Sequence, residues 1–456
     1  MIFEKTTLGN ISDKSEIINK KHIKNSSLIN SEISINNKKS KLTTKKLGDL
    51  GKIVGGSTPS TKDVNNYGGD IPWITPKDMA SLNSRYISKG KRNITKNGFK
   101  SCSTVMLPKN SILFSSRAPI GYMAINTNKI CTNQGFKSII PNENIDCLYL
   151  YYALIYNMKR IKNYGSGTTF KEISSSVMNK ITIDVLEDVK QQKKTSKILD
   201  LIDSKIEENI SINNNLVYIS KLLYKQWFID FEFPNEKGKS YKTFSGKMVD
   251  SELGYIPENW DIGFINDGKL TKIIKSGVKK FEMTKKYIAT ADVDEANIKS
   301  FTTIKYNLKP SRANMTPISN SIWFAKMQDS VKNIIVDSYM TDILDNYIFS
   351  TGFIGIKCLN NSLYYMWNYI NSDTFKSLKN NLSTGTLMAG ISNTTIVGCK
   401  YVIPSKKILN LFNIKMQTIN KKIYKNNLEN ITLKNLRDTL LTKLMNGEID
   451  LDNIEL

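Results

Sequence analysis

The sequence predicts an α+β fold in which two strand-rich domains of mixed α/β structure are joined by two long antiparallel helices, with the two halves in a pseudo-two-fold arrangement. Three observations lead to this prediction. Two regions dense in turn residues alternate with two long stretches that are free of Pro and Gly. The long stretches carry apolar residues at alternating steps of three and four, as helices with a buried seam do. Short motifs of the first half recur in the same order in the second half.

The chain begins with a polar extension, residues 1–45, which is rich in Lys, Asn, Ser and Ile and has no sustained period. This extension is either an arm that contacts phosphates or a solvated segment without a binding role. Residues 46–186 form the first predicted domain. There, Gly and Pro recur every few residues, and short apolar runs such as Ile112–Phe114 predict strands. One helix is expected near Leu148–Lys162.

A long helix is predicted over residues 187–230, because neither Pro nor Gly occurs from Lys190 to Phe233. A helix of about 40 residues is about 60 Å long and needs a partner to be stable. The remaining predicted parts are a linker at 231–252, a second domain at 253–405, a second spacer helix at 406–446 and a tail at 447–456. If the helices pair antiparallel, Asn209 lies opposite Asn426, where a buried polar pair fixes the register. Alternatively, these Asn side chains face solvent.

The chain is an internal duplication. Four motifs recur at offsets that rise from 210 to 218 residues, as small loop insertions would produce. Asn110–Phe114 recurs as Asn320–Phe324, Leu150–Tyr152 as Leu363–Tyr365, Gly167–Ser174 as Gly385–Ser392, and Leu222–Lys225 as Leu440–Lys443. Two related but divergent modules on a rigid spacer suit an asymmetric target with two parts, whereas identical halves suit a palindrome.

The composition favours a polyanionic partner, because the formal net charge is +24. AT-rich coding bias would enrich Lys and Asn in the same way without a binding role. Five scattered Cys and a single His exclude an ordinary zinc site or a His-based triad. The thiols fit a reducing cytosol, and neither a secretory signal nor a membrane span is apparent, so we expect a cytoplasmic protein without a membrane partner.

Several segments resemble the specificity subunits of type I restriction-modification systems. Gly48–Pro59, Asp70–Ile74 and Ser115–Gly121 resemble parts of a target recognition domain in that family. Gln226–Phe231 and Leu436–Asp450 resemble the ends of its helical regions. The resemblance covers about residues 46–451. In the second domain, Leu253–Trp260 fits the family, but the glycine-rich segment is reduced to Lys275–Gly277.

The resemblance implies two target recognition domains that bind double-stranded DNA. It also implies binding to methyltransferase subunits, two in number, which carry S-adenosylmethionine and modify adenine. Translocase-nuclease subunits, with ATP and Mg, would complete the complex. We therefore expect no cofactor and no metal in this chain itself.

A non-catalytic role is also indicated by missing motifs. The chain has no Pro-Pro dipeptide for an adenine methyltransferase site, no Gly-x4-Gly-Lys-Ser/Thr loop for ATP phosphates and no Pro-Asp dipeptide for a nuclease carboxylate cluster. Two alternatives stay open at this point. One is a DNA-binding architectural or regulatory protein that acts without an enzyme, and the other is an enzyme with an unrecognised site.

The candidate DNA-contacting residues lie in predicted loops. Arg117 is the leading candidate, because one guanidinium can bind guanine O6 and N7 together; alternatively, it pairs with a local carboxylate. The remaining candidates are Ser115, Ser116, Thr75, Lys77, Asn133, Gln134, Thr168, Thr169 and Lys171 in the first domain, and Lys326, Gln328, Arg312, Thr384 and Thr386 in the second.

The helix ends provide candidate partner contacts. Trp227, Phe228, Leu444 and Met445 either dock a partner's helices or pack against the chain's own domains. Tyr151, Tyr152, Tyr364 and Tyr365 are expected in the core rather than as platforms for base stacking.

Overall fold

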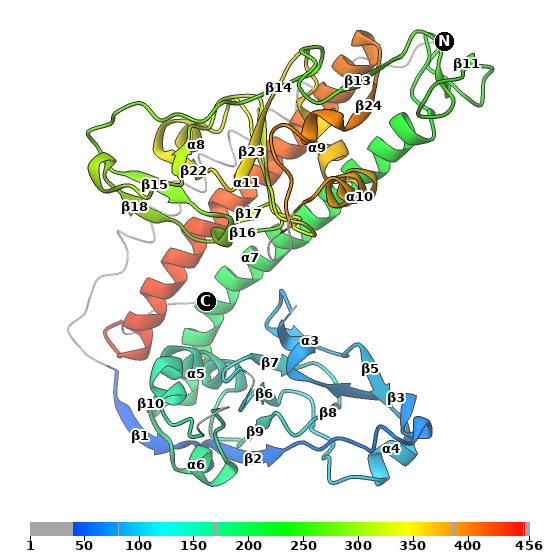
Figure 1. Ribbon diagram of the computed structural model, residues 1–456. Coiled ribbons are helices and arrows are strands. Elements are labelled where there is room, and N and C mark those ends of the chain that lie inside the picture. The colour runs from blue at the N-terminus through cyan, green and yellow to red at the C-terminus, as the bar shows by residue number, and fades with distance from the viewer. Residues whose placement is uncertain are drawn as a thin grey trace, which may run out of the picture. The chain divides into compact units, whose positions relative to one another are not determined.

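In the computed structural model, each long helix divides its length between two units of the chain. One unit contains residues 1–210 and 428–456, and the other contains residues 211–427. The structure describes residues 40–80, 82–117, 119–167, 171–384, 389–449 and 451 (Figure 1). Most of the predicted N-terminal extension therefore lies outside the described residues.

The first unit is built on a five-stranded sheet in the order β2-β9-β6-β7-β4, in which β4 runs parallel to β7 and the other neighbours are antiparallel. A three-stranded sheet, β5-β3-β8, and the pair β1-β10 complete its strands. The strands are β1 Leu42–Lys46, β2 Gly51–Gly55, β3 Tyr67–Ile74, β4 Tyr86–Ile87, β5 Arg92–Ile94, β6 Ile112–Phe114, β7 Met123–Asn126, β8 Cys131–Thr132, β9 Lys137–Pro141 and β10 Thr182–Leu186. The short helices are α2 Leu47–Leu50, η1 Val64–Asn66, α3 Pro76–Ala80, α4 Lys96–Lys100 and α6 Ser175–Lys180.

Helix α5, Cys147–Lys162, supplies much of the first unit's core, and the helix predicted near this position is confirmed. The Asp146 side chain caps its start by accepting a hydrogen bond from the Tyr149 amide. Tyr149 and Tyr152 are fully buried, together with Leu199 of the following long helix. Residues 42–45 were assigned to the polar extension from sequence. They instead belong to β1, where backbone pairing with β10 orders them.

The second unit has a four-stranded antiparallel sheet, β14-β23-β20-β21, and a second sheet, β18-β15-β22-β19, in which β15 and β22 are parallel. Its strands are β11 Met248–Val249, β12 Ile256–Pro257, β13 Asp261–Phe264, β14 Thr271–Ile273, β15 Lys285–Ile288, β16 Val293–Asp294, β17 Asn297–Ile298, β18 Thr302–Ile304, β19 Ala313–Met315, β20 Ser321–Ala325, β21 Asn333–Val336, β22 Tyr347–Ser350, β23 Phe353–Cys358 and β24 Lys400–Ile403. The short helices are η3 Thr290–Asp292, η4 Tyr306–Leu308, α8 Thr341–Asn346, α9 Leu363–Ile370, α10 Asp373–Asn381 and η5 Ile396–Gly398.

Part of the predicted linker also belongs to the second unit's core. Phe233 is buried and stacks on Tyr241 and Trp260, with ring centroids 4.6 and 4.9 Å away. The polar composition of residues 236–252 gave no sign of this contact in the sequence. The contact depends on the stacking of Phe233 with Tyr241 and Trp260, which holds the segment in place.

The duplication is visible in equivalent hydrogen bonds within each unit. The turn before β6 places Asn110 at φ 64°, and the turn before β20 places Asn320 at φ 54°. The Ser116 amide donates to the Gly135 carbonyl, as the Lys326 amide donates to Gly352. The Ile173 amide donates to Ser116, and the Ile391 amide donates to Lys326 in the same way. Two different sequences therefore build one backbone frame.

The long helices are α7, Val189–Tyr224, which continues into a π-helical turn at Lys225–Ile229, and α11, Lys406–Met445. In the first unit, Asp203 pairs with Arg437 and Asn209 donates to Asn430. In the second unit, Asn426 donates to Asn213. The residue numbers run in opposite directions, so the predicted antiparallel pairing is confirmed.

The predicted register of these helices is wrong by one turn. Asn209 lies against Asn430, not Asn426, and it is 1% exposed, so the solvent-facing alternative is also wrong. In the predicted register, Lys422 would face Asn213 and Lys205 would face Asn430. The observed register instead joins Asn209 to Asn430 and Asn213 to Asn426, and each pair shares a hydrogen bond of 2.8–2.9 Å between buried amides. Hydrogen bonding between buried amides therefore selects the register.

Candidate nucleic-acid interface

Loops from separate strands of the first unit meet in one cluster, which we call loop cluster 1. Its described parts are residues 57–58, 75–77, 115–117, 133–135, 166–167 and 171–172. Backbone hydrogen bonds connect them: the Ser57 amide donates to Thr132, the Asn133 amide to Ile74 and the Ser116 amide to Gly135, at 2.8–3.0 Å. The cluster is thus held by the sheets.

The close approach of these loops requires glycine at residue 56. A Cβ atom at Gly56 would lie 2.1 Å from the Asn133 carbonyl oxygen and 2.3 Å from that of Thr132. Any other residue would push the 57–58 and 133–135 loops apart. The glycine-rich start of the first domain is therefore part of the frame of loop cluster 1.

Arg117 is the half-exposed cation of this cluster. Its Nη1 lies 3.3 Å from Glu172 Oε2, and both side chains are 35% exposed. Lys137 Nζ is 3.4 Å from the other oxygen of Glu172. The local carboxylate named as the alternative partner is therefore present. Because the pair is long and solvent-exposed, it contributes little and can be exchanged for another anion.

Two serines predicted to contact DNA are buried instead, and those predictions are corrected. Ser115 and Ser116 are 0% exposed. Their hydroxyls donate to the carbonyls of Pro119 and Gly135, at 2.7 and 3.2 Å. Strand β6 ends in the core, so both serines stabilise the turn that presents Arg117.

The other candidate DNA-contacting residues of the first domain differ in whether their side chains are exposed or are used to hold a loop. The Thr75 hydroxyl donates to Asp78 at 2.6 Å, and Asn133 Oδ1 accepts from the Gly135 amide at 3.0 Å. Both side chains therefore hold loop geometry. Lys77, Gln134 and Lys171 are exposed, and Gln134 accepts a hydrogen bond from the Thr58 hydroxyl. Thr168 and Thr169 lie outside the described residues.

An equivalent loop cluster 2 is present in the second unit, comprising residues 312–314, 326–328, 351–352, 384 and 389–391. Arg312 and Thr384 are exposed; the Arg312 carbonyl accepts from Thr351, and Thr384 exchanges backbone hydrogen bonds with Gly390. The Gln328 amide donates to Ala389, and its side chain is exposed. Thr386 lies outside the described residues.

Lys326 does not occupy the position of Arg117. It occupies the Ser116 position, while Met327 forms the bridge to Gly390 that Arg117 forms to Glu172. Burial lowers the pKa of Lys326, whereas Met327 is 51% exposed. Cation and carboxylate in one cluster are thus replaced by Met and Gly in the other, so the two surfaces differ in chemistry on the same frame.

Comparison with known proteins places this frame in a family. A family model described as the type I restriction modification DNA specificity domain matches residues 39–216. The MjaIX specificity subunit of a type I restriction enzyme from Methanocaldococcus jannaschii is 33% identical over 434 residues, which are 90% of this chain and 94% of that protein. This chain belongs to the family of type I restriction enzyme specificity subunits.

Further comparisons agree with that assignment. The HindI specificity subunit from Haemophilus influenzae is 34% identical over 142 residues, 30% of each chain. The crystal structure of a type I restriction-modification S subunit from M. genitalium has a TM-score of 0.56 at 16% identity and covers 89% of this chain and 96% of its own. As a specificity subunit, the chain is a non-catalytic DNA-recognition component, and the resemblance drawn from its motifs is confirmed.

Of the two alternatives for the helix ends of this specificity subunit, packing against the chain's own domains is the one observed. Trp227, Phe228, Leu444 and Met445 are at most 4% exposed. The ring centroid of Phe228 lies 4.8 Å from those of Phe412 and Tyr365, so Phe228 belongs to the second unit's own core. The large apolar residues that are exposed lie elsewhere on the helices. They are Leu201, Val217, Tyr218, Ile219, Leu222 and Ile229 on α7 and its π turn, and Leu411, Ile414, Leu428, Ile431 and Leu436 on α11. Their positions off the heptad seam are the sequence signal that could have identified them.

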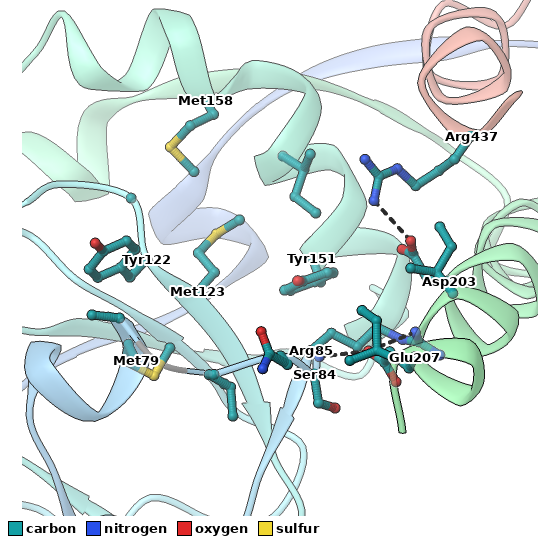
Figure 2. Close-up of a pocket in the computed structure, with 17 residues that line it drawn as sticks. Met79, Ser84, Arg85, Tyr122, Met123, Tyr151, Met158, Asp203, Glu207 and Arg437 are labelled. Carbon is teal, nitrogen blue, oxygen red and sulfur yellow. Dashed lines mark hydrogen bonds and ion pairs between the residues drawn. The ribbon is translucent and has the colours of Figure 1, made fainter. Parts of the chain in front are cut away.

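A pocket of about 480 Å³ lies in the first unit where the first recognition domain meets the helices (Figure 2). Met79, Met123, Met158 and Tyr151 contribute apolar lining, and Arg85, Asp203, Glu207 and Arg437 contribute charge. Figure 2 shows Arg85 joined to Glu207 and Arg437 joined to Asp203. Sequence reasoning missed Arg85, although the acidic run at Asp200–Glu208 gave a signal for a cationic partner.

Two searches over the described part of the chain bear on other functions. No helix there is long and apolar enough to cross a membrane. Within the same residues, no group of three or more His, Cys, Asp or Glu side chains could hold a metal ion. The buried tyrosines Tyr151, Tyr152, Tyr364 and Tyr365 are at most 8% exposed, as expected for core residues.

Proposed function

We propose that this specificity subunit reads a two-part, asymmetric target in double-stranded DNA, with one half-site read by each loop cluster. One observation carries the proposal: the two clusters share a backbone frame but differ in the side chains they present. Arg117 and Glu172 of loop cluster 1 stand where Met327 and Gly390 stand in loop cluster 2. A guanidinium favours guanine, whereas a thioether favours apolar contact such as a thymine methyl group. The half-sites would therefore differ in sequence.

The charge of the chain supports DNA as the ligand. The net charge of +24 suits a polyanion, and exposed Lys77 and Lys171 add positive charge beside Arg117. Contacts of Lys and Arg with phosphates release counterions, so binding should weaken steeply with salt. Phosphate contacts would position the domains, and the loop side chains would select the bases.

The proposed partners follow from the family. Two methyltransferase subunits would bind this chain, carry S-adenosylmethionine and modify adenine in the target. Translocase-nuclease subunits, which use ATP and Mg, would cleave unmodified DNA. The exposed apolar residues of the helices, such as Tyr218 and Leu222, are the proposed docking surface for the methyltransferase, because exposed aromatic and aliphatic side chains are typical of interface centres.

The test is base-by-base mapping of adenine methylation on a plasmid library in cells that express this chain with its neighbouring methyltransferase. A single gapped, asymmetric motif that disappears when this chain is omitted is expected. Arg117→Ala should relax one half-site and leave the other unchanged. Arg160→Ala is the matched control, because Arg160 is exposed on α5 and donates to the Thr182 carbonyl rather than lying in a loop cluster. No motif, or a motif that persists without this chain, would contradict the proposal.

A further inference from the structure

We propose that Arg85 is a positioning residue that fixes the angle of the first recognition domain on helix α7, and thereby restricts the number of base pairs between the two half-sites. This inference rests on the proposed two-part target. It is carried by contacts within the first unit alone.

Arg85 is buried and bridges the domain to the helix. Its side chain is 5% exposed, and its Nη2 donates to Asp200 Oδ1 at 2.6 Å and to Ser204 Oγ at 2.7 Å. Glu207 Oε1 accepts from the Arg85 backbone amide at 2.8 Å and lies 3.1 Å from Nη1. These contacts span two turns of α7. The Arg85–Asp200 pair is both charged and hydrogen-bonded, and such a contact is directional, so it fixes orientation as well as distance. Glu207 adds the backbone hydrogen bond and a charge pair, because Nε and Nη1 of Arg85 are buried without a hydrogen-bond partner.

The backbone of Arg85 is fixed in the domain. Its carbonyl accepts a hydrogen bond from the Ile125 amide of β7 at 2.8 Å, and Tyr86, the next residue, begins β4. A force on the guanidinium is therefore transmitted to the central sheet. The same sheet contains β6, which ends directly before the Ser115–Arg117 turn.

The position of Arg85 along the helix gives it leverage. The domain is also joined to α7 near the chain connection, where Gln192 bonds to Asp146 and Leu186. From Gln192 to Glu207 the helix rises about 22 Å. A rotation of about 10° about the Gln192 end would displace the domain by about 4 Å at that distance, which exceeds the roughly 3.4 Å spacing of base pairs. The contact farthest from the connection therefore controls the angle.

Close packing does not replace this contact. The pocket of about 480 Å³ lies beside Arg85, between residues 79–80 and 82–85, α5 and α7 (Figure 2). Where close packing alone fixes the orientation of two parts of a protein, the side chains between them leave few spaces of this size. Apolar packing of Leu199 joins α7 to the domain core nearer the chain connection. Beside the pocket, the junction is held by the polar contacts of Arg85 and by the Tyr152 hydroxyl, which donates to Asp203 at 2.8 Å.

The second unit uses equivalent helix positions with different chemistry. Its Tyr339 ring lies 5.6 Å from Tyr424 and 5.9 Å from the Lys421 ammonium. These α11 residues lie 217 positions after Glu207 and Ser204, within one residue of the 218-residue offset between the repeated helix motifs. Each domain therefore contacts a similar part of its helix. The first does so through the ion pairs of Arg85, and the second through the aromatic and cation–π contacts of Tyr339.

The experiment measures gap length. The chain, with its methyltransferase, is given plasmids in which the half-sites are separated by gaps from two base pairs shorter to two longer than the natural one. For Arg85→Met, we expect methylation at gaps changed by one base pair to rise about tenfold relative to wild type, a loss of discrimination of about 1.4 kcal/mol, with half-site bases unchanged. Lys205→Met is the control, because Lys205 is exposed and pairs with Glu208 on the same helix.

Each outcome decides the inference. A broadened gap profile for Arg85→Met supports it, and an unchanged profile overturns it, whether methylation stays full or falls. If Arg85→Met does not fold, Glu207→Gln, which keeps shape and removes one charge, replaces it under the same criterion. If the wild-type complex methylates no two-part motif, the proposed function fails and this inference fails with it. If wild type methylates such a motif and the variants show the same dependence on gap length, only this inference fails.

Discussion

Replacing the buried Asn209–Asn430 pair by leucine should stabilise the first unit, but only when both residues are changed. The Asn209 side chain donates to Asn430 at 2.9 Å and to Glu429 at 3.0 Å, while its own Oδ1 is buried without a hydrogen-bond partner. The pair therefore already includes one unsatisfied group, which costs about 1–3 kcal/mol. Apolar residues at both positions would remove that cost.

The expected change in stability is small for each single variant and larger for the double variant. In Asn209→Leu alone, the apolar gain is offset by the buried Asn430 amide left without its donor, so stability should stay within about 1 kcal/mol of wild type. Asn430→Leu should behave alike. The double variant buries two leucines and leaves no amide behind. After an overpacking cost of about 1–3 kcal/mol, we expect a gain of about 2–4 kcal/mol.

The assay is a double-mutant cycle by calorimetry of the full chain, in which the first unit's melting temperature should shift by about 2–4 °C per kcal/mol. Stability changes that simply add would refute the reasoning, because the argument depends on coupling of the two amides. The Asn213–Asn426 pair stays in place and still specifies the register, so the methylated motif should not change.

Three further predictions follow from the sites described above. Arg117→Ala should lower discrimination at one base pair by about tenfold or more, from the 1–3 kcal/mol of a bidentate contact, as read by methylation mapping; loss of preference in both half-sites would contradict the assignment to loop cluster 1. Tyr218→Ser with Leu222→Ser should weaken methyltransferase binding by about tenfold or more without lowering the melting temperature, measured by titration calorimetry, since both side chains are exposed; binding unchanged from wild type would place the docking surface elsewhere. Burial lowers the pKa of Lys379 from 10.5 to about 8, so the unfolded chain binds more protons between these values and the second unit should gain stability as the pH rises from 8 to 10.5; Lys379→Met should lose this gain, and an identical pH profile for the variant would show that another group causes it.

The sequence was sufficient for the architecture because the features that determine it are long and repeated. Two stretches of about 40 residues with one seam each predict a helix pair regardless of any single residue. Four motifs in the same order predict two equivalent domains. Both features average over many positions, so errors at individual residues do not change the conclusion.

The helix register and the binding residues could not be predicted in the same way, because they depend on contacts between distant segments. A heptad seam repeats itself, so a shift of one turn leaves the apolar pattern nearly unchanged; pairing of Asn209 with Asn430 becomes visible only in three dimensions. Ser115 and Ser116 look like available donors in sequence, but β6 directs both into the core. Trp227 looks like an anchor for a partner, but it is covered by the chain's own second domain.

The buried polar contacts of this chain occur where parts must meet in one arrangement. The Asn pairs connect the helices and Arg85 connects the first domain to α7, whereas the Glu172–Arg117 pair lies at the exposed loop surface. Apolar residues at the first two places could give more stability, since burying a charge or an amide is costly even when it is paired. They would also allow neighbouring registers and angles with similar energy, because apolar contacts are not directional. For the proposed reading of two half-sites at one separation, a single geometry matters more than additional stability, and the positions of the Asn pairs and of Arg85 agree with that requirement.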